Sequence, residues 1–220
     1  LEEAEVSYKK TIILNPDYFE DYNNLGAILN NLERLEEAET CYKKAIELNP
    51  SYVEAYSNLS ITLLKLGKSE EAESSYKKVI KLKPDFAEAH YNLANIYRFS
   101  KLKEAEISYK KAIKLKPNFV IAHYNLGITL KGLGKLKEAE AVYKKTIELE
   151  PKFAEAYNNL GNIQNSLKKM NESLISYEHA ISLKPEIDYL LTRYDEVFLD
   201  IKVSLDDASL SEKLQCPSAK

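Results

Sequence analysis

The residues able to bind metals or transfer protons are few in this sequence and poorly spaced for either purpose. His90 and His123 occupy matching places, which would suit a pair of metal ligands, but Tyr22, Tyr56 and Tyr157 fill the same place elsewhere. A histidine that alternates with tyrosine is expected to serve as an aromatic packing residue rather than a ligand. No pair of carboxylates stands alone in an apolar setting, so no general acid or base can be nominated. We therefore expect no catalytic residue, metal site, cofactor or enzyme activity.

Two further patterns are too weak to indicate chemistry. The segment Leu66–Ser69 ends like a phosphate-binding loop, but Thr62 stands where the first glycine of such a loop belongs, and no strand precedes it. Cys41 and Cys216 lie far apart and match no ligand spacing. Free thiols in a reducing compartment are expected, which favours the cytoplasm. The sequence begins at Leu1 and not at a methionine, so whether a targeting segment precedes it is left undecided.

Composition narrows the class of protein and of partner. Hydrophobic residues make up 45% of the 220 residues, and six glycines and seven prolines leave little material for turns, so long helices with short connections are expected. The 31 basic and 34 acidic residues are mixed at short range, and a nucleic-acid partner is not expected. No apolar run reaches the roughly 20 residues of a membrane span. Composition does not indicate the oligomeric state.

One polar side chain does recur in register. An asparagine stands two residues after an aromatic residue or histidine and directly before a leucine. A carboxamide offers both a donor and an acceptor, which suits the alternating groups of an extended peptide backbone whatever its side chains are. We call these five residues the asparagine ladder: Asn24, Asn58, Asn92, Asn125 and Asn159.

The ladder belongs to a longer pattern with a period of 33 or 34 residues. Such a period indicates a repeat architecture in which each copy is one supersecondary unit. A tyrosine stands eight residues before each proline of the pattern. The prolines are Pro16, Pro50, Pro84, Pro117, Pro151 and Pro185, and the tyrosines are Tyr8, Tyr42, Tyr76, Tyr109, Tyr143 and Tyr177.

Each copy is predicted to form two amphipathic helices. In the copy Glu54–Pro84, apolar residues recur at helical spacing from Tyr56 to Leu66 and again from Ala72 to Leu82. Gly67 is expected to supply the turn between the helices, and Pro84 to end the second. No single helix pair buries its apolar face, so the copies must stack on one another.

Polar residues predict how the helices begin and which side faces solvent. Ser51 stands three residues before Glu54, and Asp17 and Asp85 precede a glutamate at the same spacing, which predicts capping boxes at the first helices. The second helices carry pairs such as Glu73 with Lys77 at i,i+4. Such pairs predict a solvated outer face rather than a basic binding stripe.

The unit Glu54–Pro84 resembles the tetratricopeptide repeat. The resemblance implies an all-α fold, a right-handed superhelical solenoid of antiparallel helix pairs, and it covers about 185 of the 220 residues. It implies that the chain is a scaffold that binds a protein or peptide, with the first helices lining a concave groove. The signature residues are Tyr56, Leu59, Ser60, Leu63, Ala72, Tyr76, Val79 and Pro84.

The period and the resemblance together predict the domain organisation. Residues 1–16 are the second helix of a truncated first repeat, 186–205 a capping helix, and 206–220 a polar tail or linker. The repeat at 85–117 is one residue short where Arg98, Phe99 and Ser100 form the helix turn. This is either a harmless shortening or a specialised contact. The five complete repeats are 17–50, 51–84, 85–117, 118–151 and 152–185.

The resemblance places the asparagine ladder along the inner face of the groove, where we expect it to bind peptide. The alternative is that the asparagines are kept for helix packing. The ladder is similar to that in the repeat arms of protein O-linked N-acetylglucosamine transferases, so a second hypothesis is a substrate-recruiting arm of such an enzyme. The carboxylate-clamp type of repeat domain is not matched. Further residues expected at the groove are Asn95, Asn162, Tyr91 and Tyr124, with Lys65, Arg98 and Lys131 near its far edge.

Overall fold

The computed structural model describes residues 1–185 and 196–197, and these residues form eleven α-helices and no strand. The predicted all-α fold is confirmed. The predicted capping helix at 186–205 and the tail at 206–220 lie outside the described residues, apart from Glu196 and Val197. The helices are α1 Glu2–Leu14, α2 Phe19–Asn31, α3 Leu35–Leu48, α4 Val53–Lys65, α5 Ser69–Leu82, α6 Ala87–Tyr97, α7 Leu102–Leu115, α8 Val120–Gly132, α9 Leu136–Leu149, α10 Ala154–Ser166 and α11 Met170–Leu183.

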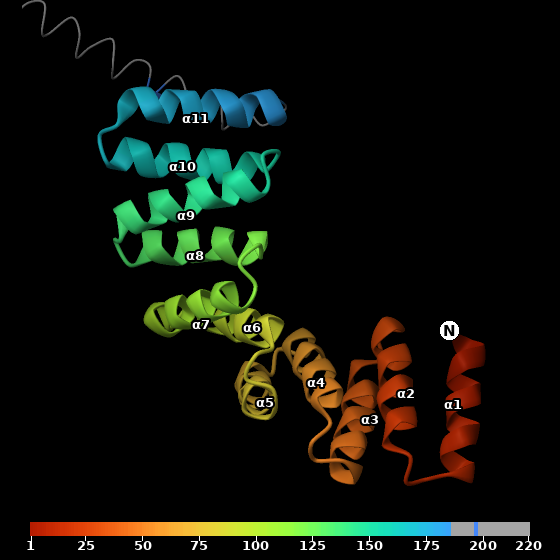
Figure 1. The fold of residues 1–220 in the computed structure, drawn as a ribbon. Helices are drawn as coiled ribbons and strands as arrows, with labels where there is room; N and C mark the ends of the chain where they lie inside the picture. The colour runs from red at the N-terminus through yellow and green to blue at the C-terminus, as the bar shows by residue number, and fades with distance from the viewer. Residues whose placement is uncertain (186–195, 198–220) are drawn as a thin grey trace, which may run out of the picture. The chain divides into compact units, whose positions relative to one another are not determined.

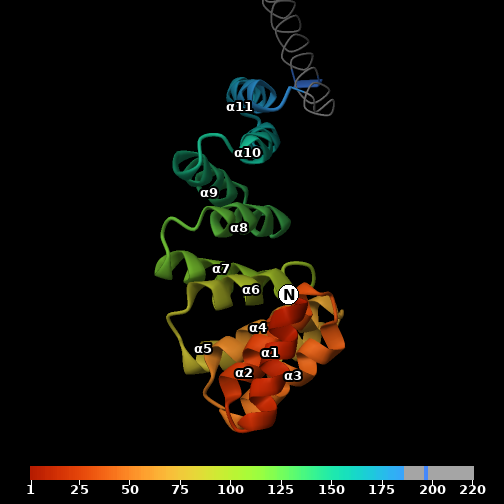
Figure 2. The same cartoon turned by 90° about the vertical axis from the view of Figure 1, so that its right-hand side faces the viewer.

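The chain divides into two compact units. Unit 1 is Leu1–Pro117 and contains α1 to α7, and unit 2 begins at Asn118 and contains α8 to α11. In each unit, helices that follow one another in sequence pack together and reverse direction through short turns (Figure 1). The side view in Figure 2 shows α8 to α11 stacked in chain order within unit 2. The predicted antiparallel helix pairs are therefore confirmed inside each unit.

Proline sets the end of every second helix. These helices stop two residues before a proline, and the residue between takes an extended backbone, as at Asn15 (φ −140°, ψ 82°) and Asn49 (φ −134°, ψ 92°). The proline ring excludes the helical conformation from the residue before it, so the helix cannot continue. The prediction that Pro84 ends its helix is confirmed, since α5 ends at Leu82.

The capping-box prediction is wrong. The first helices α2, α4 and α6 have Tyr18, Tyr52 and Phe86 as N-caps, and none of these ends has a side-chain cap. The proline turn needs one more residue than the capping box allows, because the Tyr52 N–H donates to the carbonyl of Asn49 at 3.1 Å. Ser51 lies inside that turn, where its hydroxyl donates to Asn49 Oδ1 at 2.7 Å.

The turn within each pair uses the left-handed backbone region. Gly67 has φ +74°, as predicted, and Gly134 has φ +72°. Glu33 and Lys168 occupy the same place with φ +58° and +59°, a conformation that costs non-glycine residues free energy. The short repeat omits this residue, and Lys101, the N-cap of α7, has φ −133°. The missing residue is therefore the one that the left-handed turn would need.

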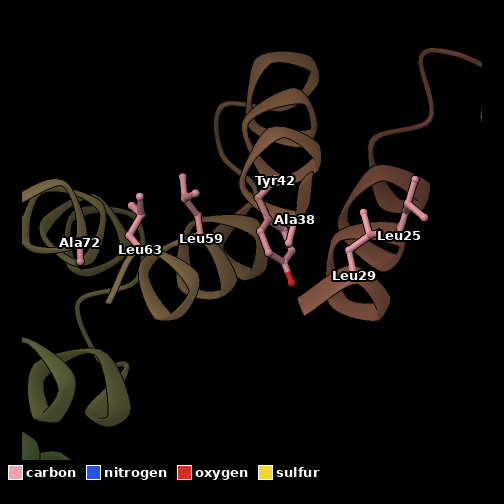
Figure 3. Close-up of a cluster of buried hydrophobic side chains, with 7 residues drawn as sticks. All are labelled: Leu25, Leu29, Ala38, Tyr42, Leu59, Leu63 and Ala72. Carbon is pink, nitrogen blue, oxygen red and sulfur yellow. The ribbon is translucent and has the colours of Figure 1, made fainter. Parts of the chain in front are cut away.

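The recurring tyrosine forms the centre of each repeat. Tyr42 extends from α3 between α2 and α4, with Leu29 on the α2 side and Leu59 on the α4 side, in one cluster with Leu25 and Leu63 (Figure 3). Its ring lies directly on the α2 backbone, because a β-carbon added at Gly26 would stand 2.8 Å from Tyr42 Cε1. The five tyrosines with the same role are at most 1% exposed, namely Tyr42, Tyr76, Tyr109, Tyr143 and Tyr177.

Candidate functional site

The asparagine ladder lies at the edge between the buried and exposed sides of the first helices. In unit 1, Asn24, Asn58 and Asn92 are half-buried, because each directly precedes a buried core leucine. Asn58 Nδ2 donates to Oδ1 of Asn23 on α2 at 3.0 Å. The asparagine at 58 therefore joins two neighbouring first helices, which sequence reasoning did not foresee.

Unit 2 uses its ladder residues in a similar way. Asn125 on α8 is buried, and Asn159 Nδ2 on α10 donates to the Tyr124 hydroxyl at 3.1 Å. The Tyr124 ring packs against Phe153 with 4.7 Å between centroids, and against Tyr143 with 6.0 Å. The structure thus brings two of the expected groove residues, Tyr124 and Asn159, into contact, and this contact also packs α8 against α10.

The second pair of predicted asparagines serves the buried tyrosines. The Tyr109 hydroxyl donates to Asn95 Oδ1 at 2.6 Å, and the Tyr177 hydroxyl donates to Asn162 Oδ1 at 3.0 Å. Tyr91 lies beside Tyr109, with 6.0 Å between ring centroids. Each of these asparagines therefore satisfies the hydroxyl of a buried core tyrosine.

Two of the buried tyrosines lack such a partner. The hydroxyls of Tyr76 and Tyr143 are buried without a hydrogen bond. Burial raises the pKa of Tyr76 to about 12, and the nearby Asn92 amide opposes part of that rise. Burial likewise raises the pKa of Tyr143. These phenols stay neutral at physiological pH, so they contribute packing rather than proton transfer.

The three predicted cations stand at the C-terminal ends of first helices and are exposed. Lys65 forms an ion pair with Glu33 at 3.1 Å. The Arg98 guanidinium lies over the ring of Phe99 at 4.5 Å from its centroid. Lys131 in unit 2 is exposed. These cations suit the rim of a binding surface better than its centre.

Apolar side chains on the same helix faces were missed by sequence reasoning. Ile61 and Leu64 on α4 are exposed, and so are Ile121 and Ile128 on α8. Ile121, Tyr124 and Ile128 follow helical spacing and therefore share one side of α8. From the sequence these residues pass for core, because apolar residues lie on both sides of α8. Their exposure cannot be predicted from the sequence, because it depends on which side of α8 the neighbouring helices cover.

The second helices carry a network of ion pairs. The predicted solvated face holds for the lysines of these pairs and not for their glutamates. The lysines of the i,i+4 pairs are exposed, but Glu39, Glu73 and Glu140 are largely buried. Each of these carboxylates also bonds a lysine of the next repeat, such as Lys101 Nζ to Glu73 at 3.0 Å. The hydrogen bond from Lys77, opposed by burial and aided by Lys101, lowers the pKa of Glu73 to about 2.

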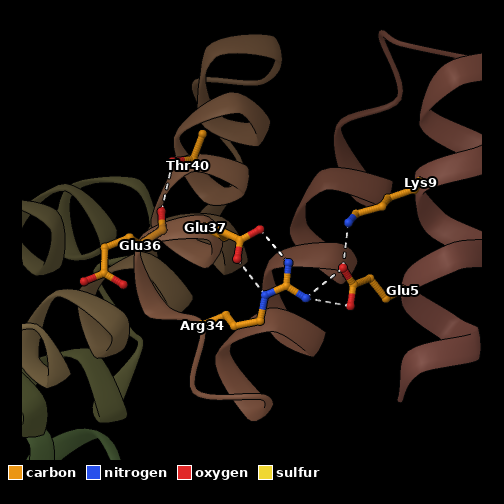
Figure 4. Close-up of polar contacts among 6 residues, drawn as sticks. All are labelled: Glu5, Lys9, Arg34, Glu36, Glu37 and Thr40. Atoms are coloured by element: carbon orange, nitrogen blue, oxygen red, sulfur yellow. Dashed lines mark hydrogen bonds and ion pairs between the residues drawn. The ribbon is translucent and has the colours of Figure 1, made fainter.

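At the start of unit 1, arginine takes the place of the lysine. Arg34 lies between Glu5 of α1 and Glu37 of α3 (Figure 4). Its Nη1 is 2.9 Å from both Glu5 oxygens, and its Nη2 is 2.6 Å from Glu37 Oε2. Lys9 adds a further contact to Glu5 at 2.6 Å. Glu5 therefore ties α1 to the next repeat through Arg34, and Glu37 holds Arg34 from within the same repeat.

Within the described residues, no group of three or more histidine, cysteine or acidic side chains is placed to hold a metal ion. None of the helices described here combines the length and apolar character that crossing a membrane requires. What the surface offers is hydrogen-bonding amides beside exposed apolar side chains on rigid helices. The fold and this surface together define a helical-repeat binding protein.

Comparison with known families identifies the repeat. Tetratricopeptide repeat models match residues 22–85, 100–134, 129–167 and 154–187, which together span well over half of the chain. The chain belongs to the tetratricopeptide repeat family. Family and fold support a protein-interaction scaffold and suggest that it is non-catalytic. None of the curated proteins compared with the chain matches it significantly.

Solved structures share the fold. YrrB, described as a TPR protein with an unusual peptide-binding site, is 24% identical, with 84% of this chain and 96% of YrrB covered and a TM-score of 0.75. MamA is 26% identical over 74% of this chain and 95% of its own, with a TM-score of 0.71. A thermophilic TPR protein of Thermus thermophilus is 26% identical over 82% of this chain and 99% of its own, with a TM-score of 0.55.

Proposed function

We propose that the chain binds extended segments of a partner polypeptide along its first-helix surface. We define this surface as the exposed faces of α2, α4 and α6 in unit 1 and of α8 and α10 in unit 2. The observation that carries the proposal is the chemistry of these faces. The half-buried amides of Asn24 and Asn58 lie on the faces of α2 and α4, and exposed aliphatic side chains lie on α4 and α8, namely Ile61, Leu64, Ile121 and Ile128.

Such a surface suits a peptide backbone better than a folded, charged partner. The amides can pair with backbone groups, and Ile61, Leu64, Ile121 and Ile128 can bury apolar side chains of the segment. Exposed aliphatic residues are expected to contribute most to the binding free energy where the contacts that surround them exclude water. The peptide-binding site described for YrrB agrees with this proposal.

Selection from a phage-displayed library of random 12-residue peptides tests it. Each peptide recovered on the whole chain should lose about tenfold in affinity with Ile61→Asp or with Ile128→Asp, according to the unit it binds. The matched controls Ile107→Asp and Ile175→Asp alter second helices and should leave the affinity unchanged. The tested isoleucines are 43% and 44% exposed and the controls 70% and 55%, so all four side chains lie on the surface rather than in the core. Fluorescence anisotropy measures the affinities.

Two results would reject the proposal. One is that no peptide is enriched on the chain. The other is that the second-helix controls weaken binding as much as the first-helix variants do.

The same surface would also serve a substrate-recruiting arm of a larger enzyme, such as a glycosyltransferase. The recurrence of the ladder asparagine in five repeats favours this second candidate, because a row of amides can hold substrates of varied sequence. A catalytic domain encoded in the same gene would support it, and a full-length gene consisting of repeats alone would reject it.

A further inference from the structure

A hollow of about 300 Å³ opens on the first-helix surface of unit 1. It lies between α2, α4 and the turn that leads into α6. Its size suits one side chain of a bound segment rather than a whole ligand. The residues that define its chemistry are Asn23, Glu54, Ser57, Asn58, Lys83 and Phe86.

The amides of Asn23 and Asn58 present one hydrogen-bond donor and one acceptor to a side chain that enters the hollow, which we call the guest. Asn58 Nδ2 donates to Asn23 Oδ1 at 3.0 Å, which leaves the Asn23 amide hydrogens and the Asn58 carbonyl oxygen available. The Ser57 hydroxyl donates to the Val53 carbonyl at 3.0 Å, so its oxygen can only accept. The hollow therefore offers a donor and acceptors side by side.

The charges around the hollow cancel and are held apart. In the next repeat of unit 1 the corresponding lysine and glutamate, Lys116 and Glu88, are 2.8 Å apart. At the hollow, Lys83 Nζ instead lies 5.2 Å from the centroid of the Phe86 ring. Within the part of the chain that the structure describes, neither Lys83 nor Glu54 has an ion-pair partner. A guest thus meets one positive and one negative group.

The corresponding position in unit 2 carries a larger side chain. Tyr124 stands where unit 1 has Asn23, and its hydroxyl accepts the hydrogen bond from Asn159 Nδ2 at 3.1 Å. In that repeat Lys184 is also paired with Glu155. Unit 1 thus carries a smaller side chain than unit 2 at this position, and the hollow is found beside the smaller one.

We propose that this hollow captures a primary carboxamide side chain, glutamine or asparagine, of the bound segment. A carboxamide can accept from the Asn23 amide and donate to the Asn58 carbonyl. A carboxylate or an ammonium group would lose water and still face a like charge, at Glu54 or Lys83. An aliphatic guest would bury the amide groups unpaired. The inference rests on the proposed function, because the hollow is part of the same first-helix surface.

Nuclear magnetic resonance of the ¹⁵N-labelled whole chain tests it with single amino-acid derivatives. N-acetylglutamine methylamide should shift the side-chain amide signals of Asn23 and Asn58 with a Kd of about 1 mM, as expected for a fragment of this size. The corresponding glutamate, lysine and leucine derivatives should bind at least about fivefold more weakly. Asn23→Tyr, which copies unit 2, should abolish the response, and Asn31→Tyr on the exposed end of α2 should not.

A second variant guards against a misfolded Asn23→Tyr. Asn23→Leu keeps the side-chain size and removes the donor, so it should erase the preference for glutamine over leucine. Equal or tighter binding of the glutamate or lysine derivative would overturn the inference, as would an absent response to glutamine. Neither result depends on peptide selection, so a failed hollow and a failed first-helix surface are told apart.

Discussion

Replacing Glu73 by glutamine should weaken the packing of α5 against the next repeat, and only where the wild-type carboxylate is ionised. Glu73 accepts from Lys77 at 2.7 Å, from Lys101 at 3.0 Å and from the Tyr97 hydroxyl at 3.0 Å. Glutamine keeps an acceptor for Tyr97 and loses the charge. The variant therefore removes the attraction to both lysines with little change of shape.

The size of the effect follows from the pKa. Its fall from 4.5 to about 2 in the folded chain corresponds to an upper bound of about 3 kcal/mol for the ionised form. Lys77 and Lys101 are 58% and 47% exposed, so solvent screens the attraction. We expect a loss of about 1 to 2 kcal/mol in the free energy of unfolding at pH 7. Because the folded pKa is depressed, this difference should shrink below pH 4.5 and vanish near pH 2.

Urea unfolding followed by circular dichroism between pH 3 and pH 7 measures the difference. Repeat arrays do not always unfold in one step, so amide hydrogen exchange in α5 and α7 is used to find which helices lose stability. The control Glu47→Gln removes a 68% exposed carboxylate paired with Lys44 and should change stability by less than about 0.5 kcal/mol. A loss that is equal at pH 3 and pH 7, or equal at Glu47, would refute the electrostatic reasoning.

Two further comparisons use matched positions of unit 2, with thermal and urea unfolding as the measurement. Tyr177→Phe should cost about 0.5 to 1.5 kcal/mol, because its hydroxyl bonds Asn162, whereas Tyr143→Phe removes an unbonded buried hydroxyl and should be neutral or stabilising. An equal cost at both positions would contradict this. Lys168→Gly should raise stability by about 0.5 to 1 kcal/mol and Gly134→Ala lower it by about 1 kcal/mol, because both residues have positive φ. The reverse order would show that the turn is not strained.

The features that were predicted from the sequence are those decided within one repeat. The recurring tyrosines, the end of α5 before Pro84 and the turn at Gly67 all depend on backbone restriction and local spacing within a repeat. The capping-box prediction also used local spacing. It failed because the proline turn moves the N-cap from Ser51 to Tyr52.

What was missed depends on contacts between repeats. Glu73 and Lys77 form a predictable i,i+4 pair, but burial of the carboxylate follows from Lys101 and Tyr97 in the next repeat. The exposure of Ile128 depends on which side of α8 its neighbours cover. A one-dimensional pattern shows that a residue is apolar or charged and does not show what lies across from it.

The ladder asparagines must be tested with this overlap of roles in mind. Asn159 bonds the Tyr124 hydroxyl, so Asn159→Ala removes a packing contact and a proposed peptide contact together. Asn24 is half-buried on α2, and among the described residues no hydrogen bond to its side chain is found. If the ladder binds peptide, Asn24→Ala should weaken a peptide bound to unit 1 by about threefold to tenfold and leave the melting temperature unchanged. A lower melting temperature with unaltered affinity would instead assign the ladder to packing, because the amide would then stabilise the folded chain without contacting the peptide.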